Sequence, residues 1–113
     1  MTSSTPLPTP MPNLFDDAHA PAQGERFETL LAHRNLVIER IVSAADIQPT
    51  DYVQPQDEWV LLLRGEATLT VAGRPVHLRS GDHLFLPAGT HHVVQHTTDG
   101  ALWLAIHLHP QQP

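Results

Sequence analysis

The sequence contains no cysteine and no lysine, and each absence excludes a class of chemistry. Without cysteine, the chain forms no disulfide and offers no thiolate nucleophile or thiolate metal ligand. A bound metal would therefore need histidine, carboxylate or neutral oxygen donors. Without lysine, Schiff-base catalysis and a lysine-containing phosphate loop are excluded.

Positive charge and long apolar runs are also scarce. The six basic residues are scattered arginines and the formal net charge is −6, which argues against a nucleic-acid partner because phosphate neutralisation needs clustered Lys and Arg. No run of about eighteen apolar residues exists, so we expect no membrane-spanning segment. The first residues lack the basic start and apolar block of a signal peptide, and we expect a cytoplasmic location.

Proline and histidine, by contrast, are abundant, with eleven and nine copies. The prolines argue against a helical bundle, because each removes a backbone donor and clashes with the preceding turn. Four of them, Pro6, Pro8, Pro10 and Pro12, stand at alternate positions, which predicts a flexible, disordered arm. That arm could lack a function or could pack on a partner subunit. We expect a proline-rich arm at residues 1–24, a folded domain at 25–110 and a tail at 111–113.

Short apolar segments rich in β-branched residues predict an all-β domain. We expect strands at residues 26–31, 36–43, 59–63, 67–71, 75–78, 83–86, 92–96 and 102–108, and a loop at 44–57. A short helix at 25–32 stays an alternative, since Phe27, Leu30 and Leu31 also fit helical spacing. Many short strands with evenly spaced turns are typical of a sandwich or barrel.

Two patches of the sequence carry the functional signal. In the first, six residues separate Glu58 from Gly65. In the second, Gly81 precedes Pro87-Ala88-Gly89 by five residues, and His92 follows after two more. The patches resemble the two motifs of the cupin family, G-x5-H-x-H-x3–4-E-x6-G and G-x5-P-x-G-x2-H-x3-N. The resemblance implies a small single-domain cupin, whose fold is a double-stranded β-helix or jelly-roll barrel.

The first patch departs from the family motif because its two histidines are replaced. With a three-residue spacer before Glu58 their positions fall on Tyr52 and Gln54, and with a four-residue spacer on Asp51 and Val53. We favour the three-residue register, because Tyr52 and Gln54 can direct polar atoms to the same side of an extended segment.

The resemblance implies a metal site of altered composition. The expected ligands of one divalent ion (Fe, Mn, Ni or Zn) are Gln54, Glu58 and His92, since imidazole and carboxylate suit these ions and an amide oxygen is a weaker donor. Tyr52 is the candidate catalytic residue, placed to donate a proton or orient a substrate oxygen. A lone Glu58 inside a barrel is costly unless it is neutralised, and either a dication or a protonated histidine would do this.

Strand periodicity supplies the candidate substrate-binding residues, which are His96, Trp103 and His107. Side chains two apart share a face, so we expect His96 on the same side of its strand as His92. Trp103 and His107 likewise share one face of the last expected strand. The sequence leaves open whether that face or the opposite one looks into the barrel.

Two main functions fit these residues. The first is a small metal-binding cupin with one divalent ion and a small polar ligand in its cavity, and as an enzyme it would be a metal-dependent oxygenase or isomerase. The second, motivated by the missing histidine pair, is a metal-free, non-catalytic cupin that senses or binds a small molecule. A third hypothesis is a structural domain that binds a partner through the arm.

We also expect a homodimer through residues 26–43, since small cupins commonly pair through N-terminal strands. A chain this short gains stability from burial between subunits.

Overall fold

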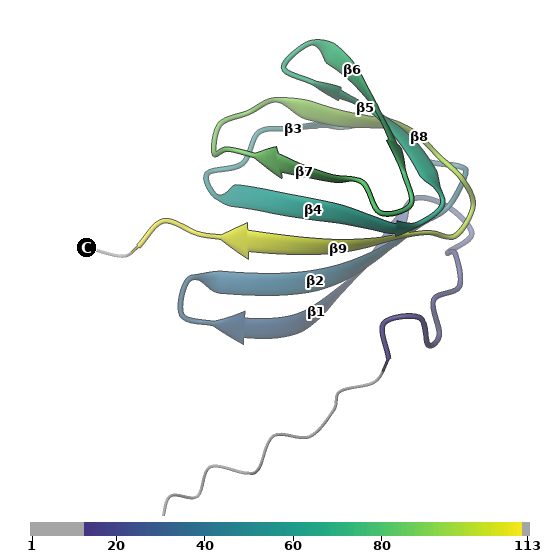
Figure 1. Cartoon of the computed structure of the whole chain (residues 1–113), viewed down its shortest axis with the longest axis horizontal. Helices are drawn as coiled ribbons and strands as arrows, with labels where there is room; N and C mark the ends of the chain where they lie inside the picture. The colour runs from purple at the N-terminus through teal and green to yellow at the C-terminus, as the bar shows by residue number, and fades with distance from the viewer. Residues whose placement is uncertain (1–12, 112–113) are drawn as a thin grey trace, which may run out of the picture.

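The computed structural model describes residues 13–111, and antiparallel strands make up the regular structure of that range (Figure 1). They are β1 (Glu25–His33), β2 (Leu36–Ser43), β3 (Asp51–Tyr52), β4 (Asp57–Arg64), β5 (Glu66–Val71), β6 (Arg74–Arg79), β7 (His83–Leu86), β8 (His92–Thr97) and β9 (Ala101–Leu108). The predicted all-β class is confirmed. Within residues 13–111 no helix is long and apolar enough to cross a membrane.

Two sheets face each other and form the walls of a jelly-roll barrel. The larger sheet has the order β1-β2-β9-β4-β7 and the smaller one the order β3-β8-β5-β6. Figure 1 shows the larger sheet below and the smaller one above and behind it, with the chain crossing between them after β2, β3, β4, β6, β7 and β8. Residues distant in the sequence thus meet inside the barrel.

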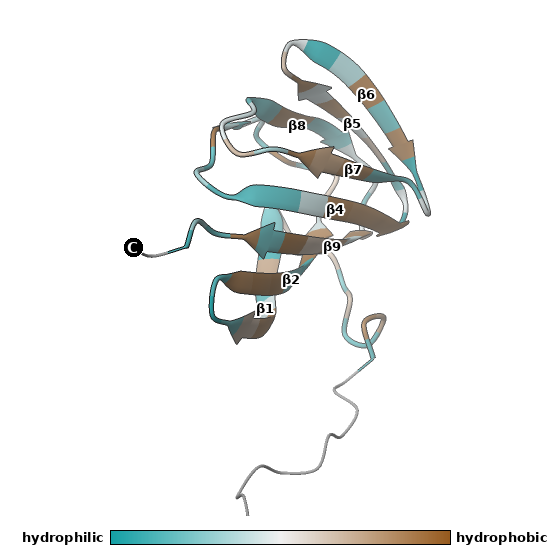
Figure 2. Cartoon of the chain, turned by 60° about the vertical axis from the view of Figure 1, so that its left-hand side comes forward, coloured by the Kyte–Doolittle hydropathy of each residue, from teal (hydrophilic) through white to brown (hydrophobic). Residues whose placement is uncertain are grey.

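Strand alternation explains how one carboxylate enters the apolar interior. Val60 and Leu62 of β4 are buried in the core with Trp103 and Ala105 of β9. Because side chains two apart share a face, Glu58 points into the same interior. Figure 2 shows the first part of β4 as hydrophilic and the second part as hydrophobic, so the barrel has one polar end.

The first strand settles the choice between strand and helix at residues 25–32. β1 pairs along its length with β2 through a tight turn at Arg34 and Asn35, where Arg34 has a φ of 54°. The structure also contains a strand that the sequence did not predict. β3 lies within the expected loop at 44–57 and pairs Tyr52 with His92 of β8.

Residues 13–24, part of the expected arm, lie against the outer face of the larger sheet. Ala18 is buried with Val42 and Leu102, and the Arg40 guanidinium donates a hydrogen bond to the carbonyl oxygen of Leu14. The alternating prolines of the expected arm, in residues 1–12, and the last two residues of the expected tail lie outside the described residues.

Gly65 occupies a position that a side chain would disturb. It follows β4 with a φ of 95°, a backbone region that favours glycine. An added Cβ would lie 2.5 Å from Oγ1 of Thr98 and 3.1 Å from the Cα of Ala101. The glycine of the first motif therefore lets the β4–β5 turn pass close to the β8–β9 turn.

We expect Gly65→Ala to lower the free energy of unfolding by about 2–5 kcal/mol, because steric overlap adds to the cost of a positive φ. Gly73→Ala is the matched control, since Gly73 has a φ of 79° but open space around it. Its expected loss is about 1–2 kcal/mol. Urea unfolding measures both, and equal losses would contradict the close approach of the two turns.

Candidate functional site

A cavity of about 70 Å³ lies between the two sheets at the polar end of the barrel. Three carboxylates, two imidazoles, a phenol, an amide and an indole share its wall with six apolar side chains. The polar members are Glu25, Glu39, Tyr52, Gln54, Glu58, His92, Trp103 and His107. Six of the seven residues expected in the site thus line one cavity, and His96 does not.

Glu58 is at the centre of this site and is 7% exposed. Its Oε1 lies 3.8 Å from Nε2 of His92 and its Oε2 lies 3.9 Å from Nε2 of His107. Both distances exceed a hydrogen bond, and the hydrogen bonds found within residues 13–111 include none to this carboxylate. Burial raises the pKa of Glu58, and the two nearby histidines oppose that rise.

His107 enters the cavity because the Trp103 face of β9 looks inward. Trp103 and His107 are 3% and 6% exposed, which settles the choice that the sequence left open. β9 pairs with β4 so that His107 lies opposite Glu58. Nε2 of His107 is 2.8 Å from Oε1 of Glu39. That hydrogen bond raises the pKa of His107, the charge of Glu58 raises it further, and burial opposes both.

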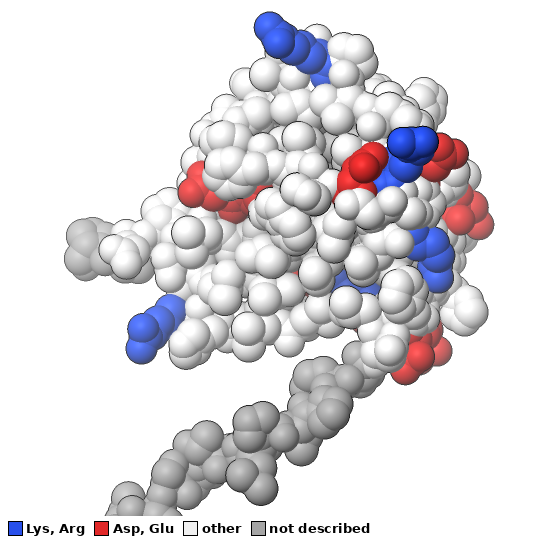
Figure 3. Space-filling view, in the orientation of Figure 1, with Lys and Arg blue, Asp and Glu red and all other residues white. Residues whose placement is uncertain are grey.

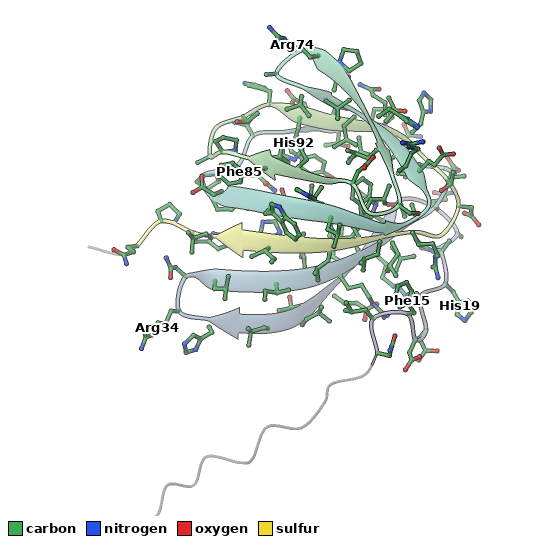
Figure 4. The ribbon with its side chains drawn as sticks, viewed as in Figure 1. Phe15, His19, Arg34, Arg74, Phe85 and His92 are labelled. Carbon is green, nitrogen blue, oxygen red and sulfur yellow. The ribbon has the colours of Figure 1, made fainter. Side chains whose placement is uncertain are left out.

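His92 faces Glu58 from the opposite sheet and is 7% exposed. Its Nδ1 lies 3.2 Å from the carbonyl oxygen of Thr90, a contact that fits an Nδ1–H donor and leaves Nε2 directed at the cavity. Its ring stacks on Tyr52 with centroids 5.5 Å apart. Figure 4 shows His92 between the two sheets, whereas Phe85 of β7 is on the outside of the barrel.

The replaced histidine positions of the first motif both reach the cavity. Tyr52 and Gln54 line it. Val53 is exposed, and the exposed Asp51 lies 3.1 Å from Nδ1 of His91. The structure therefore agrees with the three-residue register.

The expectation that His96 shares the cavity face with His92 is wrong. A β-bulge in β8 shifts the pairing with β5, so that Leu69 lies opposite Val94 but Thr68 lies opposite His96. The extra residue reverses the alternation of side chains. His96 is consequently exposed, and His96 is not part of the cavity wall.

Two acidic residues of the cavity were missed by sequence reasoning. Glu25 accepts a hydrogen bond from Oγ of Ser43, which in turn accepts one from the Trp103 indole. Glu39 holds His107. Neither glutamate belongs to a motif. The alternation along β2 gave no signal, because the packed 13–24 segment also buries Arg40 on its other face.

The expected metal ligands meet at the cavity but do not form a ready-made metal site. Within residues 13–111, no group of three His, Asp or Glu side chains is arranged to hold an ion. Nε2 of His107 is engaged by Glu39. Two ligand atoms about 2.1 Å from one ion lie roughly 3.0–3.4 Å apart in regular geometry, closer than the 3.8 and 3.9 Å around Glu58. Metal binding would require these side chains to move.

Comparison with known proteins identifies the class that this barrel and its motifs define. A family model described as a cupin domain matches residues 40–111, so the chain belongs to the cupin family. A comparison with curated proteins finds no match.

Solved structures add three informative neighbours. A candidate mannose-6-phosphate isomerase of Ralstonia eutropha JMP134 is 38% identical over 90% of this chain and 100% of that one, with a TM-score of 0.80. KdgF from Halomonas sp. is 14% identical over 79% and 82%, with a TM-score of 0.70. The cupin domain of an XRE family transcriptional regulator from Enterobacter cloacae is 12% identical over 79% and 100%, with a TM-score of 0.66. At these identities, the last two show the fold alone.

The Glu39–His107 hydrogen bond makes stability depend on pH. Because the pKa of His107 is raised above its usual 6.5 in the folded state, its contribution is fully present below pH 6.5 and is lost as the pH rises through the raised value. We expect Glu39→Gln to lower the pKa of His107 in an NMR titration and to flatten this part of the stability profile.

The matched control is Glu66→Gln, since Glu66 lies 3.3 Å from the exposed His77 and not near the cavity. It should leave the titration of His107 unchanged. An unaltered pKa of His107 in the Glu39→Gln protein would show that this hydrogen bond does not stabilise the protonated form of His107.

Proposed function

We propose that this chain is a small-molecule-binding cupin that holds a polar ligand in the barrel without a resident metal ion. The supporting observation is that Glu58 and Nε2 of His92, both on side chains more than nine-tenths buried, face the cavity without a hydrogen bond from the protein. The fully buried side-chain atoms without a partner in residues 13–111 are Nε of Arg26 and Nε of Arg40, so Glu58 and His92 are open to the cavity. A ligand that bonds both groups would replace the water there.

The size of the cavity limits the part of the ligand that enters it. Its volume of about 70 Å³ is above the ~10–15 Å³ that one water needs. We therefore expect the cavity to enclose only a small polar group of the ligand. Such a group is too small to fill the barrel with apolar contacts, so hydrogen bonds must hold it.

Tyr52 supports binding and orientation of the ligand. It lines both the cavity and a second, larger depression at the barrel mouth. Burial raises the pKa of its hydroxyl, so the hydroxyl stays protonated and able to donate a hydrogen bond. If the site is catalytic, Tyr52 and the Glu39–His107 pair are its proton donors and acceptors.

A metal-dependent oxygenase or isomerase is the second candidate. It is supported by the near-equal distances from the two oxygens of Glu58 to His92 and His107, and by the similarity to the candidate isomerase of R. eutropha. Gln54, Glu58 and His92 would then hold an iron, manganese, nickel or zinc ion. The ion would supply Lewis-acid activation of a carbonyl oxygen, or redox chemistry in the case of iron.

Elemental analysis and native mass spectrometry of untagged protein separate the two candidates. We expect less than about a tenth of a metal ion per chain, and a melting temperature that EDTA leaves unchanged, because no interaction in the proposed site depends on an ion. We also expect a retained small molecule that the His92→Ala protein loses. His96→Ala is the matched control from the same strand, outside the cavity, and should retain it.

About one metal ion per chain, with a melting temperature lowered by EDTA, would contradict the metal-free proposal and favour the second candidate.

Two further expectations from the sequence, a homodimer and a cytoplasmic location, stay predictions. We propose pairing through β1, because within residues 13–111 this edge strand pairs with β2 alone. It exposes Phe27 and Leu31. Antiparallel pairing of two such edges is self-complementary and closes a dimer.

Light scattering should give about twice the chain mass of 12.5 kDa. A proline at an outward-facing backbone N–H of β1 should reduce this to the monomer mass, because proline cannot donate to a shared ladder. A monomer at every concentration in the native protein would contradict pairing.

A further inference from the structure

The cavity wall carries more acidic than basic side chains. Glu25, Glu39 and Glu58 line it, and neither arginine nor lysine does. Burial raises the pKa of Glu25 and of Glu58; when all three carboxyl groups are ionised they outnumber the two imidazoles, even if both imidazoles are protonated. The cavity therefore disfavours an anion by direct like-charge repulsion, and the low dielectric of the interior strengthens that repulsion.

The entrance has the same sign. A depression of about 350 Å³ shares Glu25, Phe27, Tyr52 and Val94 with the cavity, and adds Asp46 but no basic residue. Figure 3 shows the basic side chains of the visible face as separate patches, one of them beside acidic side chains. A charged ligand that enters through this mouth thus passes carboxylates before it reaches Glu58, which favours the approach of cations.

Glu58 adds the observation that points to a ligand. It is 7% exposed, aims into the cavity, and has gaps of 3.8 and 3.9 Å to the imidazoles. We infer that the cavity binds a small organic cation with N–H donors, such as a primary ammonium group, and rejects phosphorylated and carboxylated compounds; this rests on the proposed small-molecule binding. An ammonium group donates charge-assisted hydrogen bonds to Glu58.

A preference for cations would set this chain apart from its R. eutropha neighbour, the candidate mannose-6-phosphate isomerase. Proteins bind a phosphate group mainly through arginine, lysine, protonated histidine or the N–H groups at a helix N-terminus. The cavity and its mouth contain no arginine or lysine, and residues 13–111 contain no helix. A sugar phosphate would thus meet three glutamates and two histidines, both of which already lie within 4 Å of Glu58.

Four probes of graded charge test the inference. Ethanolamine, ethylene glycol and glycolate have nearly the same size but carry a positive, zero and negative charge at neutral pH, and mannose 6-phosphate tests the sugar phosphate. ¹⁵N NMR follows the indole N–H of Trp103, which lines the cavity and is hydrogen-bonded to Ser43. We expect ethanolamine to bind at least about tenfold more tightly than ethylene glycol, and the two anions not to shift this resonance.

Matched variants connect the preference to the cavity carboxylates. Glu58→Gln should remove most of the preference for ethanolamine, whereas the surface control Glu66→Gln should keep it. Glu25→Gln, which changes the wall shared by the cavity and its mouth, gives an independent reading and should weaken ethanolamine binding without weakening that of ethylene glycol.

The inference is overturned if glycolate or mannose 6-phosphate binds as tightly as ethanolamine, if ethanolamine shows no selective binding, or if both variants keep the full preference. The metal content and the retained small molecule test the proposed function separately, so the two can fail independently.

Discussion

The burial of one carboxylate, Glu58, is the constraint on which the rest of the site depends. The alternation that places Val60 and Leu62 in the core directs Glu58 into the same interior, so the strand cannot form the barrel without enclosing this group. Histidines from the two sheets approach it to 3.8 and 3.9 Å, and neither forms a hydrogen bond to it. The barrel therefore keeps a polar cavity at one end instead of closing over an apolar core.

Two replaced motif histidines and two further glutamates determine the hydrogen-bonding groups and the charge of that cavity. Where the cupin motif has two histidines, this chain has Tyr52 and Gln54, which bind through hydrogen bonds more readily than through metal ligation. Glu39 engages the imidazole of His107, and Glu25 is joined to the Trp103 indole through Ser43. The result is a wall of hydrogen-bond acceptors with three carboxyl groups, which underlies the proposed preference for cations, whereas the metal-free proposal rests on the spacing around Glu58.

The sequence predicted the parts of this account that follow from period and motif. The barrel, the meeting of Glu58 with His92 and the register of Tyr52 could all be read from the spacing of apolar, turn and motif residues. The sequence did not predict which face of β9 looks inward, because residues on both faces are buried, Trp103 on one and Leu102 on the other. The sequence also did not predict the bulge that turns His96 outward, since no glycine or proline marks it. It did not predict the role of Glu39 either, because both faces of β2 are covered.

A crystal structure of the untagged protein at high resolution tests the central claim most directly, namely that Glu58 is buried against a cavity that a hydrogen-bonding molecule fills. The account predicts density for a water or small molecule between Glu58 and the imidazoles of His92 and His107, with a donor atom about 2.6–3.2 Å from the carboxylate. A Glu58 side chain that bonds an imidazole directly, or that points to bulk solvent, would contradict it.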